Sequence, residues 1–113
     1  MHEYSIVLSL LESCEEHIKT HNASKVTKLV VKIGVLSGVE PELLQRAFDT
    51  FKEESVCHDS LLDLHVQKVV IACNGCNEES ILENLEFQCP RCGSHDIIIK
   101  DGEEMYLMQL ELE

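Results

Sequence analysis

CNGCNEESILENLEFQCPRCG, residues 73–93, carries four cysteines paired as Cys73-x-x-Cys76 and Cys89-x-x-Cys92, with twelve residues between the pairs. Each pair places two thiolates on one tight turn. Two such turns facing each other form a tetrahedral cage of four sulfur atoms, which is the arrangement of a structural zinc site. The spacing therefore predicts that this part of the chain is a zinc-binding module.

The module around the cysteines, residues 72–100, is too short to fold on a hydrophobic core of its own. Zinc would supply about 10–16 kcal/mol, by analogy with zinc-finger peptides. Gly93 allows the chain to bend after the second pair, so that backbone N–H groups can point at the sulfurs. Two alternatives stay open. Disulfides would need an oxidising compartment, and a tetrathiolate iron centre would have Phe87 as its only aromatic cover.

Composition restricts the classes of partner. The chain has 113 residues and a net charge of −12, with 21 acidic and 9 basic side chains. That length suits one ordinary domain, or a small domain with a metal-stapled insertion. Binding to nucleic acid requires a basic surface that displaces counterions, so the charge argues against it despite the zinc module. An acidic surface suits metal cations or a basic protein partner instead.

The sequence contains no apolar run long enough to cross a bilayer. Residues 11–14, Leu-Glu-Ser-Cys, resemble the end of a lipoprotein signal, but no Lys or Arg precedes the apolar residues, and Glu3 and Glu12 interrupt the stretch. We therefore expect a cytoplasmic protein with reduced thiols and no contact with a membrane.

Hydrophobic periodicity predicts the regular elements. A period near 3.6 marks helices and a period of two marks strands. In chain order the pattern predicts a helix over residues 4–21, a strand over 25–35, a helix over 41–54, a strand over 62–70, a short strand over 97–99 and a last strand over 106–112.

This order predicts an α/β fold, with a small mixed three-stranded sheet covered by two helices. The cysteine module would be inserted between two strands of that sheet and project from one end as a zinc ribbon. The expected division is an α/β domain made of residues 1–71 plus 101–113, and an inserted zinc-binding domain made of residues 72–100.

The first three residues form a second candidate metal site. Met1-His2-Glu3 combines an amine, two backbone amides and an imidazole. Ni²⁺ and Cu²⁺ can ionise peptide nitrogens and prefer such planar nitrogen donor sets. Either the amine and both amides bind together, or the His2 imidazole and amide bind with the Glu3 nitrogen and an outside ligand. From the residues alone, an early histidine is more often a solvated side chain.

Other cysteines and histidines suggest structural roles. Cys14 lies on the apolar stripe of the first predicted helix and is expected in the core. Cys57-His58-Asp59 falls in a predicted loop, and adjacent residues seldom orient for proton transfer. No catalytic triad, phosphate-binding glycine loop or carboxylate pair is visible, so we expect that the protein is not an enzyme.

Several motifs together resemble the HypA/HybF family. They are Met1-His2-Glu3-Tyr4-Ser5 at the start of an amphipathic helix, Lys32-Ile33-Gly34, the two Cys-x-x-Cys pairs, and Cys89-Pro90-Arg91-Cys92-Gly93-Ser94. The resemblance covers essentially the whole chain. It implies a metallochaperone that delivers Ni(II) for maturation of nickel–iron hydrogenase and, in some organisms, of urease.

The resemblance also implies site residues. Nickel would bind to the His2 side chain and to backbone nitrogens of Met1, His2 and Glu3, in the α/β domain. Zinc(II) would bind to Cys73, Cys76, Cys89 and Cys92. Some relatives have a histidine after each cysteine pair, whereas Asn77 and Glu78 follow the first pair here. His95, three residues after Cys92, is the candidate for an outside nickel ligand.

The implied partners are a HypB-like GTPase, the hydrogenase large subunit and, in some organisms, urease maturation proteins. The chain itself is expected to be a monomer or a weak homodimer. The alternative function is a zinc-ribbon adaptor that recognises a basic protein and never carries nickel.

Overall fold

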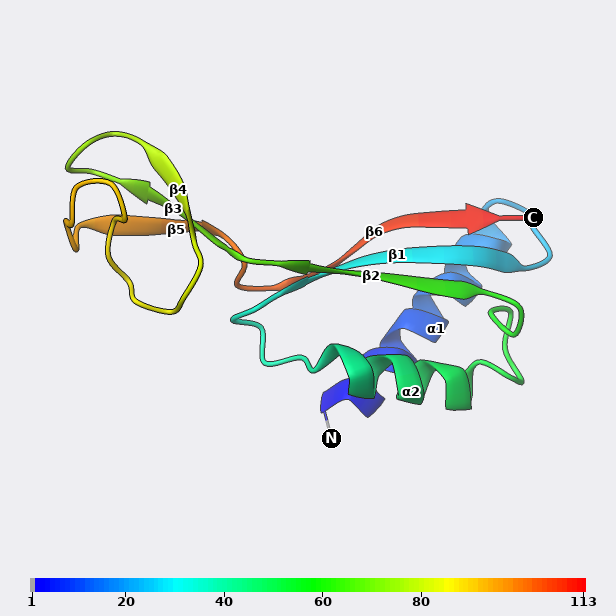
Figure 1. Ribbon diagram of the computed structural model, residues 1–113. Helices are drawn as coiled ribbons and strands as arrows, with labels where there is room; N and C mark the ends of the chain where they lie inside the picture. The colour runs from blue at the N-terminus through cyan, green and yellow to red at the C-terminus, as the bar shows by residue number, and fades with distance from the viewer. Residues whose placement is uncertain (1) are drawn as a thin grey trace.

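The computed structural model describes residues 2–113; Met1 and the side chain of His2 lie outside the described part. Within it, the elements are α1 (His2–Thr20), β1 (Val26–Gly34), α2 (Pro41–Phe51), β2 (Leu61–Gln67), β3 (Val69–Cys73), β4 (Glu79–Leu82), β5 (Ile97–Asp101) and β6 (Met105–Leu112). Figure 1 shows them arranged as a helix-covered sheet with a smaller lobe at one end. In the described chain, neither helix is long and apolar enough to cross a membrane.

The larger sheet has the strand order β2-β1-β6. β1 pairs in parallel with β2, placing Val31 opposite Leu64, and antiparallel with β6, placing Val31 opposite Leu107. Parallel pairing follows from the connection through α2, because a helical crossover returns the chain in the same direction. The predicted mixed three-stranded sheet is confirmed.

Both helices cover the same face of this sheet (Figure 1). Alternate residues of β1, namely Leu29, Val31 and Ile33, are buried, and they belong to one core cluster with apolar residues of both helices. The helical members are Val7, Leu11 and Cys14 from α1, and Leu44 and Phe48 from α2. Cys57 is also fully buried in this cluster, so the structural roles predicted for Cys14 and Cys57 are confirmed.

The helix ends differ from the sequence prediction by a few residues. α1 begins at His2, and Glu3 in its first turn accepts a hydrogen bond (3.1 Å) from the backbone N–H of Glu40. This bond ties the start of α1 to the segment that leads into α2. Asn22 has a φ of 52°, which is incompatible with continuing the helix. α2 ends at Phe51, three residues before the predicted end, and Lys52 is its C-cap residue.

The strand predicted over residues 62–70 is in fact two strands in two different sheets. β2 runs out of partners where β1 ends, since Gln67 pairs with Gly34, the last residue of β1. After Lys68 the chain continues as β3, which pairs antiparallel with β4 and β5 in a second sheet of order β4-β3-β5. The smaller lobe therefore has a sheet of its own, which includes all of β3 from Val69 onward.

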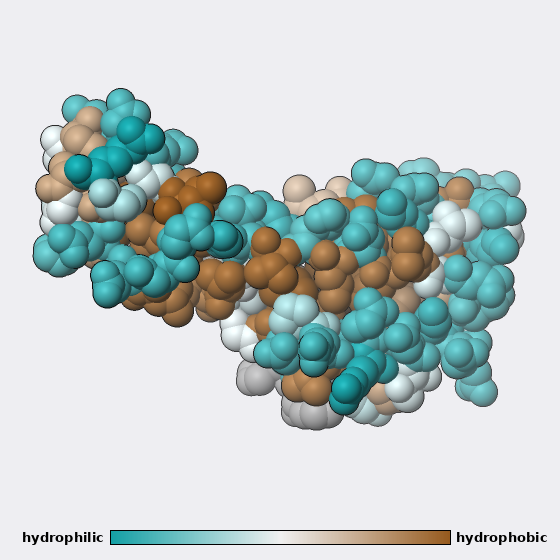
Figure 2. Space-filling model, viewed as in Figure 1, coloured by the Kyte–Doolittle hydropathy of each residue, from teal (hydrophilic) through white to brown (hydrophobic). Residues whose placement is uncertain are grey.

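The second sheet projects from one end of the larger one and gives the molecule dimensions of 52 × 28 × 17 Å (Figure 1). Apolar side chains run across the junction on the visible face, while hydrophilic ones cover most of the two ends (Figure 2). At the junction, Lys32 of β1 forms a 2.8 Å ion pair with Asp101 of β5. The hydrogen bond from Lys32 lowers the pKa of the Asp101 carboxyl, so the pair is charged at neutral pH.

Two glycines allow close approach of the backbone at the same junction. A Cβ atom on Gly34 would overlap the carbonyl group of Gly102, which has a φ of 99°. The Gly34 amide donates to the Glu104 carbonyl (3.0 Å), so the strand cannot move away without losing a backbone hydrogen bond.

We expect Gly34→Ala to lower the free energy of unfolding of the zinc-loaded protein by about 1–3 kcal/mol, because backbone must shift to accept the methyl group. Urea denaturation would measure this. Val35→Ala is the matched control: Val35 is 42% exposed, so its truncation should change stability by about 0.5 kcal/mol or less. Equal losses of unfolding free energy in the two variants would contradict the close backbone approach between Gly34 and Gly102.

Candidate metal centre

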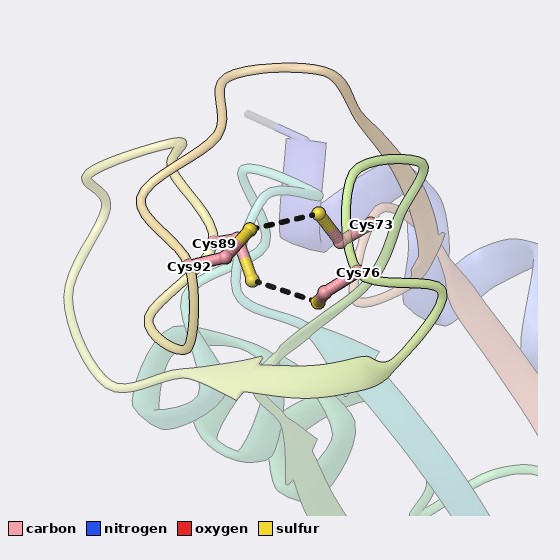
Figure 3. Close-up of side chains that lie close together, drawn as sticks. All are labelled: Cys73, Cys76, Cys89 and Cys92. Atoms are coloured by element: carbon pink, nitrogen blue, oxygen red, sulfur yellow. Dashed lines mark hydrogen bonds between the residues drawn. The ribbon is translucent and has the colours of Figure 1, made fainter.

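The four predicted zinc ligands converge in the smaller lobe (Figure 3). The sulfur atoms of Cys73, Cys76, Cys89 and Cys92 all lie within 4.8 Å of one another. The Cys73–Cys92 sulfurs are 3.5 Å apart and the Cys76–Cys89 sulfurs 3.8 Å apart. A tetrahedral ion with bonds of about 2.3 Å holds its sulfurs about 3.8 Å from each other. The cluster therefore fits a zinc site.

The two cysteine turns have the same local geometry. Behind the first pair, the amide of Asn77 donates to the carbonyl of Cys73, and behind the second, Gly93 donates to Cys89; both bonds are 2.9 Å long. The residue that follows each pair has a positive φ, 60° for Asn77 and 78° for Gly93. The sequence predicted this bend only at Gly93. Asn77 was a usable signal, because asparagine adopts this conformation more readily than most residues.

Backbone N–H groups point at the sulfur atoms of two of the cysteines. The amide of Gly75 donates to the Cys73 sulfur at 3.2 Å. The amides of Cys92 and Arg91, together with the thiols nearby, lower the pKa of Cys89 to about 7, despite its desolvation. Since metals bind thiolates, a fraction of Cys89 is ready to bind a metal ion at neutral pH.

The crowding of four thiols opposes further ionisation. The amide of Glu78 favours the thiolate of Cys76, but desolvation and the three neighbouring cysteines raise its pKa to about 11. Several negative sulfurs can share this small volume only if a cation offsets their repulsion. The cluster is therefore electrostatically suited to a divalent ion.

The four cysteines differ in their exposure to solvent. Cys73 and Cys89 are buried, Cys76 is half-buried and Cys92 is exposed. Phe87 is 43% exposed, so this aromatic ring gives the sulfurs little apolar shielding. An open cluster of this kind favours structural zinc over an iron centre for electron transfer.

The residues predicted for nickel are not brought together in the described part of the chain. Met1 and the His2 side chain lie outside it, and Glu3 is buried in the first turn of α1. His95 is exposed in the loop before β5, next to Asp96, whose carbonyl accepts from the amide of Asn74 (2.9 Å). That loop lies at the far end of the smaller lobe, well away from the start of α1 (Figure 1).

Comparison with known proteins agrees with the sequence, the fold and the cysteine cluster. Residues 1–112 match the family described as "Hydrogenase/urease nickel incorporation, metallochaperone, hypA". The chain is 50% identical to hydrogenase maturation factor HypA of Shewanella baltica (strain OS185), covering 100% of this chain and 97% of that protein. It is also 50% identical to the HypA of Aquifex aeolicus, covering 100% and 98%.

Solved structures show the same fold. The solution structure of the Ni metallochaperone HypA from Helicobacter pylori matches with a TM-score of 0.69 and 42% identity, over 97% of this chain and 96% of that one. A second structure, titled "Solution structure of HypA protein", matches with a TM-score of 0.75 and 43% identity, over 100% and 97%. The chain thus belongs to the HypA family of nickel metallochaperones that act in hydrogenase maturation.

Proposed function

We propose that this chain binds Ni(II) at its first three residues and delivers it to the precursor of nickel–iron hydrogenase, while a zinc ion holds the smaller lobe together. The observation that carries this proposal is the family match over residues 1–112, which includes the Met1-His2-Glu3 segment with its amine, amides and imidazole. The ligands would be the His2 side chain and backbone nitrogens of Met1, His2 and Glu3.

Glu3 would contribute its backbone nitrogen rather than its carboxylate. Glu3 is only 7% exposed, and one of its carboxylate oxygens already accepts the hydrogen bond from the backbone N–H of Glu40. This bond anchors the first turn of α1 against the segment before α2, and so gives the nickel site a rigid base. Ligand positions fixed by such neighbouring contacts bind metals more tightly.

Delivery requires a site that also releases its ion. Nickel bound to ionised amides competes with protons, and a partner that offers its own ligands can take the ion once an amide is reprotonated. No catalytic step is needed for this exchange, in keeping with a carrier that is not an enzyme.

Zinc would bind to Cys73, Cys76, Cys89 and Cys92 and join the two cysteine turns. We propose that residues 72–100 form the inserted zinc-binding domain, and residues 1–71 with 101–113 the nickel-binding α/β domain. His95 remains a candidate outside ligand for nickel. Because its loop lies far from the start of α1, it could reach the nickel only if the smaller lobe moved toward the helices (Figure 1).

The partners that fit this role are a HypB-like GTPase, the hydrogenase large subunit and, in some organisms, urease maturation proteins. We place the exchange in the cytoplasm, where thiols stay reduced. The chain would act as a monomer or a weak homodimer. Its charge of −12 suits basic partner surfaces and the attraction of divalent cations.

The N-terminal site makes a direct prediction. His2→Ala, or one extra residue before Met1, should remove a nickel ion bound to about one site per chain, because each change alters the planar donor set. Zinc content should stay the same. Ni²⁺ titration of untagged, zinc-loaded protein, followed by ultraviolet–visible absorption, measures the loss.

His58→Ala is the control for that titration, because His58 is exposed and lies in the loop before β2. Unchanged nickel binding in both N-terminal variants would eliminate the carrier site and leave the zinc-ribbon adaptor as the better account.

Acid should weaken nickel binding. Protons compete for the amide nitrogens, so affinity at the N-terminal site is expected to fall steadily from mildly alkaline to mildly acidic buffer. Isothermal titration in buffers of different ionisation enthalpy would also show that protons are released on binding. Affinity that is independent of pH would argue against amide ligands.

Loss of one zinc ligand should unfold the smaller lobe alone. Cys73→Ser is expected to reduce the zinc content from about one ion per chain to near zero, and the amide signals of β3, β4 and β5 should lose dispersion in NMR spectra. Signals of β1, β2 and β6 should persist. Cys57→Ala is the control, since Cys57 lies in the other core and should leave zinc content unchanged.

A further inference from the structure

Two histidines lie one turn apart near the C-terminal end of α1. The rings of His17 and His21 are stacked, with centroids 6.0 Å apart and planes 4° from parallel. Both side chains are exposed. They therefore present two imidazoles on one side of the helix, as residues spaced by four do.

Backbone hydrogen bonds select the tautomer of both rings. His17 Nδ1 lies 2.8 Å from the carbonyl oxygen of Ser13, and His21 Nδ1 lies 3.0 Å from the carbonyl oxygen of His17. A carbonyl oxygen can only accept, so each Nδ1 carries the hydrogen. In the neutral ring the lone pair is then on Nε2. Metal-binding histidines characteristically donate their other ring N–H to a carbonyl in this way.

We propose that His17 and His21 form a second Ni²⁺ site, in which the two Nε2 atoms bind the ion and water fills the remaining positions. Imidazole is a suitable ligand for nickel. Bonds of about 2.0–2.1 Å to one ion place two ligand nitrogens about 3–4 Å apart. Because the ring centroids are 6.0 Å apart, the two exposed side chains must rotate toward each other to reach that spacing. Two histidines at this separation on a helix are an established metal-binding pair.

His58 shares the contact between Nδ1 and a backbone carbonyl (Ser55, 3.1 Å), but its Nε2 atom and that of His65 have different surroundings. The Nε2 atom of His58 lies 3.2 Å from a carboxylate oxygen of Asp59, and that of His65 lies 3.1 Å from Asp63. Those two Nε2 atoms are occupied by carboxylates of the same chain, whereas no such contact engages Nε2 of His17 or His21 in the described chain.

The surroundings favour a cation. His17 lies in the last turn of α1, where the helix dipole is negative, and the protein as a whole carries a charge of −12. Lys19 lies between the histidines in sequence but on another side of the helix. Both rings border a shallow depression whose other wall is the outer strand β6, with lining residues Leu107, Met108, Gln109, Leu110 and Leu112.

This site is separate from the proposed N-terminal one. His17 comes fifteen residues after His2 in α1, which is about 22 Å at 1.5 Å per residue. Its existence does not depend on nickel binding at the first three residues. A carrier with a weaker second site could collect Ni²⁺ at one end of α1 while holding it tightly at the other.

The experiment is a Ni²⁺ titration of the full-length, zinc-loaded protein by equilibrium dialysis and NMR. We expect two classes of bound nickel. His17→Ala and His21→Ala should each weaken one class roughly 100-fold, because a linked pair of ligands gains that much over a single one. Hydrated nickel at this site should broaden the ring signals of both histidines. His2→Ala should leave this broadening in place, and His58→Ala should change neither class.

A geometric control separates a facing pair from a mere count of histidines. Lys19→His combined with His21→Ala keeps the number of histidines but places them on different sides of the helix. Nickel binding at this site should therefore stay as weak as in His21→Ala alone. Thr20→His combined with His21→Ala restores a neighbour at a spacing of three and should recover part of the affinity. If the Lys19 double variant binds like the unmodified protein, or if neither single variant loses binding, the site is overturned.

Discussion

The smaller lobe depends on four sulfur atoms being held within 4.8 Å of one another. Its buried apolar cluster is small, made of Val69, Ile71 and Leu82 with two of the cysteines themselves. Once one thiol of the cluster is ionised, its neighbours resist ionisation: the pKa of Cys89 is lowered, whereas that of Cys76 is raised. A divalent cation reverses this, because it turns repulsion among thiolates into attraction to a common centre. The same ion would thus offset the repulsion among the thiolates and link the two cysteine turns next to the small apolar cluster.

The smaller lobe is connected to the rest of the molecule at a narrow junction. β2 and β3 follow one another with only Lys68 between them, and β5 leads into β6 through the turn at Gly102. Gly34 and Gly102 pack backbone to backbone there, and the ion pair between Lys32 and Asp101 spans the two sheets. These contacts set the orientation of the smaller lobe relative to the larger sheet.

This chain is a small acidic member of a family of nickel metallochaperones, and a metallochaperone has to bind its ion and then release it. α1 connects the features relevant to that task. Its first turn is anchored by Glu3 to the segment before α2. At its other end, the rings of His17 in the last turn and of His21, directly after the helix, are parallel. Ligands made of backbone amides or of exposed imidazoles bind without a buried cavity, and another protein can reach them directly. Accessibility of this kind suits transfer better than permanent storage.

Local patterns in the amino-acid order were sufficient for the mixed sheet, both helices and the cysteine cluster. Alternation along β1 and the two Cys-x-x-Cys turns involve neighbours only a few residues apart, so their physics is contained in short stretches. Three features needed the folded chain. The division of residues 62–70 at Lys68 depends on where β1 stops offering partners. The exposure of the loop carrying His95, far from α1, depends on how the lobe projects. The tautomers of His17 and His21 depend on backbone carbonyls that come within reach of the rings only once α1 has formed. The first two features depend on contacts between residues far apart in the sequence, which no local pattern contains.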